Sequence, residues 1–136
     1  MEEEMKKAYL SIMAFFLIAV AVVACTKGYE SQKTAGNISV TLSVNQYPLV
    51  KGDNSLAVKV ADSGGKAITD AKVEARYYMP AMPGMAPMEY TAVPVLKGSA
   101  YSFGANIPME GGWKLDVSVT QPGGSPQIVT FNIDAR

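Results

Sequence analysis

The most unusual stretch of the sequence is MPAMPGMAPM, at residues 79–88. A methionine recurs at every third position of this stretch, as Met79, Met82, Met85 and Met88. The methionine thioether is a soft, neutral donor that prefers Cu(I) to hard cations and binds it without losing a proton. We therefore interpret the stretch as a candidate Cu(I) site, with Met82 and Met85 as central ligands and Met79 and Met88 as further ligands.

The backbone of this stretch is restricted by Pro80, Pro83 and Pro87. Prolines exclude a helix and a central strand because each lacks the backbone donor that both ladders need. An extended or polyproline-type loop is expected, and a period of three would place all four thioethers along one edge of it. In a fully extended loop the first and last methionines would lie about 28 Å apart. Either the loop doubles back at Gly84, or another segment supplies a ligand.

A fifth methionine, Met109, lies between two expected strands in the segment PMEGGW, at residues 108–113. Connections between the strands of a sandwich gather at its two ends, so Met109 can lie near the 79–88 loop. Trp113 could pack against sulfur, stack over a bound cation or serve as a core residue. Methionines also form adaptable contacts with protein partners, so a metal-independent interaction surface is the alternative.

The rest of the sequence offers little other chemistry. It contains no histidine and one cysteine, Cys25, which excludes a disulfide within the chain, histidine acid/base catalysis, nucleophilic triads and zinc sites of cysteine and histidine. The carboxylates fall singly on expected turns and outward strand faces, so we do not expect an enzyme. After residue 24 the chain carries ten Lys and Arg and nine Asp and Glu, a net charge of +1. Without a basic stripe, nucleic acid is not an expected partner.

The N-terminal segment predicts export and anchoring. Residues 8–24 form a weakly polar run directly after two lysines, as in a secretory signal peptide. The run ends in VVAC at residues 22–25, which resembles a bacterial lipobox, whose cysteine is lipidated and becomes the mature N-terminus. We expect a lipoprotein signal peptide at residues 1–24, a lipid on Cys25 and an extracytoplasmic protein of the periplasm or cell surface. The alternative is an uncleaved anchor, for which the run is short.

The remaining chain predicts one all-β domain. Residues 25–36 are polar without an apolar period and predict a flexible tether. From residue 37 to 136 apolar residues alternate with polar ones, and turn residues separate seven short strands: 38–44, 56–60, 73–77, 90–96, 101–107, 113–119 and 129–133. Pro94 places the fourth strand at a sheet edge. This spacing predicts an immunoglobulin-like sandwich of about seven antiparallel strands, with a small barrel as the alternative.

Four motifs, in this order, resemble the YtkA-like family, a relative of FixH-type domains: GDNSLAVKV at residues 52–60, DAKV at 70–73, the methionine-proline loop and PMEGGW at 108–113. The resemblance covers about residues 40–120. It implies a small immunoglobulin-like domain of the bacterial envelope. Relatives of this kind occur as lipoproteins, beside heavy-metal efflux components and, for FixH-type domains, in the assembly of copper-containing terminal oxidases.

The resemblance raises the expectation of copper. By residue match it carries over Met82, Met85, Met109 and Trp113. The chain differs from better-known periplasmic copper carriers in lacking histidine, which leaves Cu(I), or Ag(I) as its mimic. We expect a lipid-anchored envelope protein that binds Cu(I) and exchanges it with a copper donor or acceptor. The alternative is a metal-independent interaction module of an efflux or oxidase-assembly complex.

Overall fold

The computed structural model describes residues 28–136, so the predicted signal peptide, its helix and Cys25 lie outside the described residues. All regular structure in this part is β, and no helix here could span a membrane. The elements are β1 (Tyr29–Ala35), β2 (Ile38–Val44), β3 (Gly52–Asp62), β4 (Lys72–Met79), β5 (Met88–Ala92), β6 (Val95–Lys97), β7 (Ala100–Ile107), β8 (Gly111–Thr120) and β9 (Gln127–Ala135).

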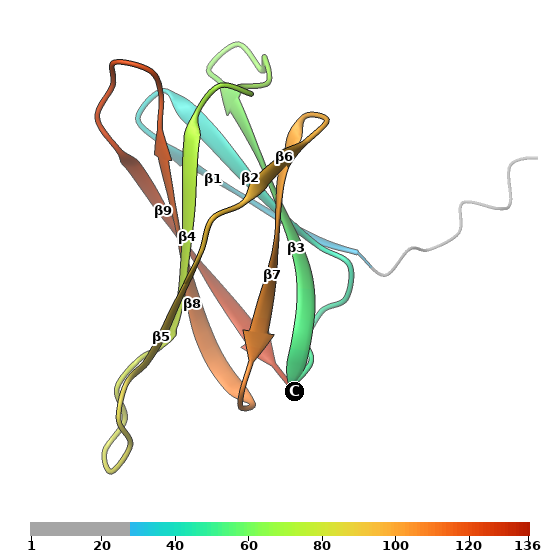
Figure 1. The fold of residues 1–136 in the computed structure, drawn as a ribbon, viewed down its shortest axis with the longest axis vertical. Helices are drawn as coiled ribbons and strands as arrows, with labels where there is room; N and C mark the ends of the chain where they lie inside the picture. Colours follow the sequence, from blue (N-terminus) through green and yellow to red (C-terminus); the bar gives the residue numbers. More distant parts are fainter. Residues whose placement is uncertain (1–27) are drawn as a thin grey trace, which may run out of the picture.

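The strands form two antiparallel sheets that pack face to face (Figure 1). One sheet has the order β1-β2-β3-β7-β6 and the other β5-β4-β8-β9. The predicted immunoglobulin-like sandwich is therefore confirmed. The described residues contain nine strands where the sequence predicts about seven.

The first additional strand lies in the predicted tether. Residues 29–35 form β1, which pairs with β2 from Tyr29 opposite Val44 to Ala35 opposite Ile38. The prediction of a flexible tether over residues 25–36 is wrong for this segment. Its side chains are polar because β1 is an edge strand, so it is held by backbone hydrogen bonds to β2 more than by burial. The Tyr29 ring also stacks on Tyr47, with centroids 4.1 Å apart.

The second difference is in the strand predicted at residues 90–96. The chain leaves one sheet after β5 and joins the other as β6, and Val93 and Pro94 form the step between them. Both β5 and β6 are edge strands, as the proline predicts. The single strand is wrong because proline cannot donate to a continuing ladder, so the chain changes sheets there.

The core lies between the sheets and follows the predicted alternation. The inward residues of β2, β3, β4, β7, β8 and β9 are buried, and Trp113 and Phe131 are the largest fully buried side chains. These residues pack against one another within the described part of the chain. Residues 28–136 therefore have the properties of an independently folding domain.

One end of the sandwich is closed by the connection between β2 and β3. Leu49 in this connection pairs in parallel with Ala135 at the end of β9. Asn54, only 9% exposed, fixes the connection: its side chain accepts from the Val50 amide at 2.9 Å and donates to the Val50 carbonyl at 2.8 Å. It also donates to the Gly52 carbonyl at 3.0 Å. A single buried amide thus satisfies three backbone groups at this end.

Replacing Asn54 by alanine tests this role. Asn54→Ala leaves the Val50 amide and carbonyl without these partners, so we expect a loss of about 1–3 kcal/mol in the free energy of unfolding, measured by urea denaturation. The control is Asn106→Ala, which removes an exposed hydrogen bond to Asp53 and is expected to cost less than about 0.5 kcal/mol. Equal losses in the two variants would contradict this account of Asn54.

Candidate metal site

The methionine stretch is a β-hairpin. Met79 at the end of β4 lies opposite Met88 at the start of β5, and Met82 forms a further bridge with Met85. The Met85 amide donates to the Met82 carbonyl at 3.0 Å. Of the two arrangements left open by the sequence, the chain doubles back at Gly84. The expectation of an extended or polyproline-type loop is therefore wrong.

The hairpin forms because its prolines occupy positions where no donor is needed. Pro83 and Gly84 are the central residues of the turn, and Gly84 has a φ of 81°, as the third residue of a type II turn requires. Continuing the register from Met79–Met88 to Met82–Met85 places Pro80 opposite Pro87. Neither can donate, so the ladder is interrupted there and resumes at the bridge.

The hairpin divides the four methionines into two levels. We call Met79 and Met88 the inner pair, and Met82 and Met85 the tip pair. The pairs are three residues apart on each arm, about 10 Å along a strand. The methionines therefore lie on two arms and at two levels, and not along one edge of an extended loop. Burial agrees: Met79 is 4% exposed and Met88 half-buried, while Met82 and Met85 are 46% and 40% exposed. The expectation that all four share one edge is wrong.

Met109 lies in the connection between β7 and β8, two residues before Gly111. The terminal methyl carbon of Met79 is 3.0 Å from the point where a Cβ on Gly111 would lie. The Trp113 indole donates to the Met109 carbonyl at 3.1 Å, which fixes the backbone of this connection. Met88 and Met109 are both half-buried against the core. The structure thus places Met109 two residues from the glycine against which the Met79 methyl carbon lies.

An aromatic cluster forms the base of the hairpin. Tyr77 and Tyr90 face each other across β4 and β5, and their rings stack with centroids 5.4 Å apart. The centroid of the Trp113 ring lies 6.4 Å from that of Tyr77 and 6.3 Å from that of Tyr90. With 1% exposure, Trp113 is a core residue, one of the roles considered from the sequence. That a cation stacks on its ring stays a prediction.

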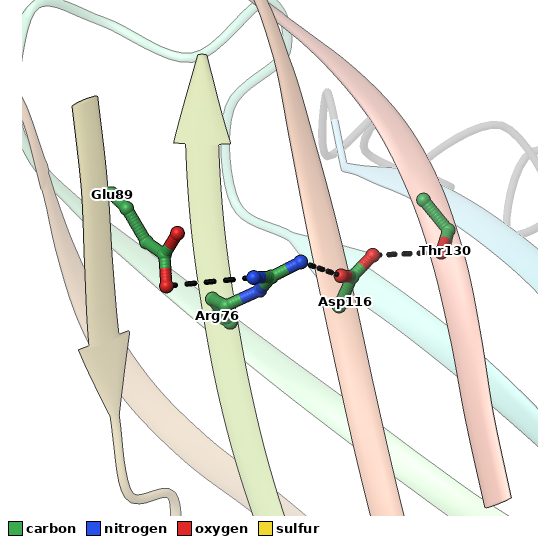
Figure 2. Close-up of polar contacts among 4 residues, drawn as sticks. All are labelled: Arg76, Glu89, Asp116 and Thr130. Carbon is green, nitrogen blue, oxygen red and sulfur yellow. Dashed lines mark hydrogen bonds and ion pairs between the residues drawn. The ribbon is translucent and has the colours of Figure 1, made fainter. Parts of the chain in front are cut away.

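A row of four polar side chains links both arms of the hairpin to the rest of the sheet (Figure 2). Arg76 on β4 contacts Glu89 on β5 at 3.4 Å and Asp116 on β8 at 2.7 Å, and Asp116 accepts from Thr130 on β9 at 2.7 Å. The hydrogen bond to Asp116 raises the pKa of Arg76 above its usual value, so Arg76 stays charged. This row of side chains crosses all four strands and orients the arms from which the hairpin extends.

A shallow groove of about 600 Å³ lies beside this row of polar side chains on the outer face of the sheet. Arg76, Asp116, Val93 and Ile128 are among its lining residues, and no methionine lines it. The groove offers no soft donor and is separate from the candidate metal site.

Among side chains that could bind a metal ion, thioethers are the ones that gather at one end of the part of the chain that the structure describes. Residues 28–136 contain no group of three or more His, Cys, Asp or Glu placed to hold a metal ion. The hairpin and the β7–β8 connection bring five neutral sulfur donors to one end of the sandwich, where Figure 1 shows the hairpin projecting beyond the strands. This donor set suits Cu(I) or Ag(I) and does not suit hard divalent cations. In the sequence, the Pro-Gly step at residues 83–84 is the signal that the chain turns back and so divides the methionines into two levels.

The model of the YtkA-like family matches residues 32–118. The chain belongs to the YtkA-like family. The match includes β2–β7, with the hairpin and Met109, and most of β1 and β8. It confirms the resemblance seen in the sequence motifs. A comparison with curated proteins gives no match.

Solved structures share the fold of this YtkA-like protein. FetP from uropathogenic Escherichia coli strain F11 is 16% identical with a TM-score of 0.54, over 79% of this chain and 95% of FetP. A copper-bound variant of Campylobacter jejuni P19 is 12% identical with a TM-score of 0.53, over 79% and 96%. The soluble domain of PmoD from Methylocystis sp. ATCC 49242 is 13% identical with a TM-score of 0.52, over 77% and 96%.

Gly111 provides a test of the inner pair. Gly111→Ala places a Cβ 3.0 Å from the Met79 methyl carbon, on a backbone with a φ of 132° that side chains rarely adopt. We expect a loss of about 1–3 kcal/mol in the free energy of unfolding, measured by urea denaturation. The control is Gly112→Ala, where the nearest atom is 3.9 Å away. If both alanines cost the same, neither the positive φ of Gly111 nor the close approach of Met79 constrains this end.

Proposed function

We propose that this YtkA-like protein binds Cu(I) through methionine thioethers and handles or delivers copper at the bacterial envelope. The observation that carries the proposal is the hairpin, which places Met82 opposite Met85 with both side chains exposed. Directly opposed side chains have Cβ atoms about 5 Å apart, so two sulfurs can turn toward one ion. We do not assign an enzymatic activity.

The exposure of the tip pair suits transfer of the ion. A ligand pair that projects from the domain can be approached by the soft donors of a second protein, so copper can pass without first entering water. The turn residues Pro83 and Gly84 limit the conformations that the tip must lose on binding. Because thioethers carry no proton to release, binding needs no change in protonation.

The structural neighbours support copper as the cargo. Copper-bound variants of both FetP and P19 share the sandwich at 12–16% identity. At this identity the likeness carries the fold and not the ligands. Methionine ligation therefore rests on this chain's own residues: five thioethers at one end, in a sequence without histidine.

The proposed place of action is the membrane surface. Lipidation of Cys25 would anchor the chain outside the cytoplasm, and β1 begins at Tyr29. Four residue steps separate these positions, which span at most about 14 Å. A lipid anchor would thus hold the sandwich close to the membrane, where a copper donor or acceptor, an efflux component or an oxidase-assembly factor could meet it.

The tip pair is tested by Met82→Leu/Met85→Leu in the chain from residue 26 onward, which removes the Cys25 thiol as a competing soft donor. Leucine keeps the apolar volume and removes the sulfur. Competition titration against a chromogenic Cu(I) chelator should show total Cu(I) uptake falling by at least one equivalent. The matched control is Ala81→Leu/Ala86→Leu, which alters the same tip without touching a thioether and should leave uptake unchanged.

Uptake equal to that of the native chain would contradict a role for the tip pair. If the native chain took up no Cu(I) at all, the alternative would be favoured: an interaction module whose projecting hairpin docks onto a membrane complex. A partner crosslinked to the hairpin would then remain bound in the presence of a strong Cu(I) chelator.

A further inference from the structure

The five methionines fall into two sets that differ in their level on the hairpin and in their burial. The tip pair and the inner pair are about 10 Å apart along the hairpin, and Met82 and Met85 are 46% and 40% exposed where Met79 is 4% exposed. An ion at the exposed tip and an ion at the buried base of the hairpin would therefore have different surroundings. We propose a second Cu(I) site, built from Met79, Met88 and Met109. The inference rests on the proposed function and deepens it.

Three observations place the second set at one end of the sandwich. The register places Met79 directly opposite Met88. The Met79 methyl carbon lies against Gly111, two residues after Met109. The Trp113 indole, by donating to the Met109 carbonyl, holds the connection that carries the third thioether. Two of these sulfurs come from one hairpin and the third from another connection, so the inner site closes only in the folded domain.

The surroundings of the inner site favour a retained monovalent cation. Met79 is 4% exposed, and Met88 and Met109 are half-buried, so an ion there would be largely shielded from water. Removing a cation from water is costly unless donors replace its hydration. Three thioethers would supply that replacement, and the clustered rings of Tyr77, Tyr90 and Trp113 at the base of the hairpin offer π faces to a cation.

The charges around the inner site are few and mostly committed elsewhere. Glu89, next to Met88, contacts Arg76 and points to the outer face of the sheet. Glu110, next to Met109, is exposed at the connection. Neutral sulfur is thus the donor type at the inner site, and its selectivity for Cu(I) over divalent cations follows from softness. The tip pair, in contrast, is open to solvent and to other proteins.

The two sites differ in the role that each can play. The exposed tip pair has two sulfurs and an open approach, which suits capture and release. The inner set has three sulfurs and restricted access, which suits retention. The hairpin thereby becomes a two-position carrier, in which an ion received at the tip is held at the base or returned from it.

The single tryptophan of the chain makes the inner site measurable. Ag(I), an air-stable mimic of Cu(I), is titrated into the chain from residue 26 onward while Trp113 fluorescence and bound metal are recorded. The native protein should bind two equivalents. In Met82→Leu/Met85→Leu one equivalent should remain and still quench Trp113. In Met88→Leu/Met109→Leu one equivalent should remain without quenching.

Each other outcome is decisive. Loss of all binding and quenching in Met82→Leu/Met85→Leu, with native binding intact, would overturn the inner site and leave the proposed function standing. Two equivalents retained by Met88→Leu/Met109→Leu would also overturn it. No binding by the native chain would instead refute the proposed function itself.

A measurement on the native chain covers the case in which the second double variant does not fold. Peroxide converts exposed methionines to sulfoxides, and mass spectrometry of peptides locates the change. Bound Ag(I) should slow oxidation of Met88 and Met109 as well as of the tip pair. Protection of Met82 and Met85 alone would contradict an inner site.

Discussion

The turn at Pro83 and Gly84 is the constraint on which the placement of the methionines depends. Gly84 adopts a positive φ, and the ring of Pro83, the residue before Gly84, fixes its own φ. The chain therefore reverses within these two residues. Reversal makes Met82 the partner of Met85, and the same register makes Met79 the partner of Met88. A turn placed one residue away would break both pairs. The positions of four thioethers are thus set by one backbone feature.

The sandwich contributes what the hairpin cannot supply. The row of polar side chains centred on Arg76 orients β4 and β5 in the sheet. Trp113 fixes the connection that carries Met109. The Arg76–Asp116 contact joins residues 40 apart in the sequence, so the arms of the hairpin are oriented only when β4 has paired with β8. Under the proposed function, this histidine-free scaffold presents a projecting sulfur-rich turn whose donors suit a soft cation and not harder ones.

Much of the fold could be predicted from the sequence because alternation with a period of two is a strong signal for half-buried strands. That signal fails for β1, whose polar side chains show no alternation because the strand is held at an edge by its backbone. It also fails at Pro94, where a single apolar run passes from one sheet to the other. In both places the deciding interactions are with distant segments that local pattern does not contain.

For the candidate site, residue types were predictable and their grouping was not. A period of three predicts one edge in a polyproline helix and two faces in a strand, and only the turn decides between these. Met109 was expected near the loop, and the structure places the Met79 methyl carbon against Gly111, two residues after Met109. Trp113 could be recognised as important, yet its hydrogen bond to the Met109 carbonyl depends on how β8 enters the sheet.

X-ray absorption at the copper edge of the Cu(I)-loaded domain tests the central claim most directly, because it reports the donor atoms themselves. Thioether ligation predicts a first shell fitted by sulfur, without the outer-shell scattering of imidazole. A first shell dominated by nitrogen or oxygen, or copper lost on desalting, would contradict the claim that this hairpin binds Cu(I) through its methionines.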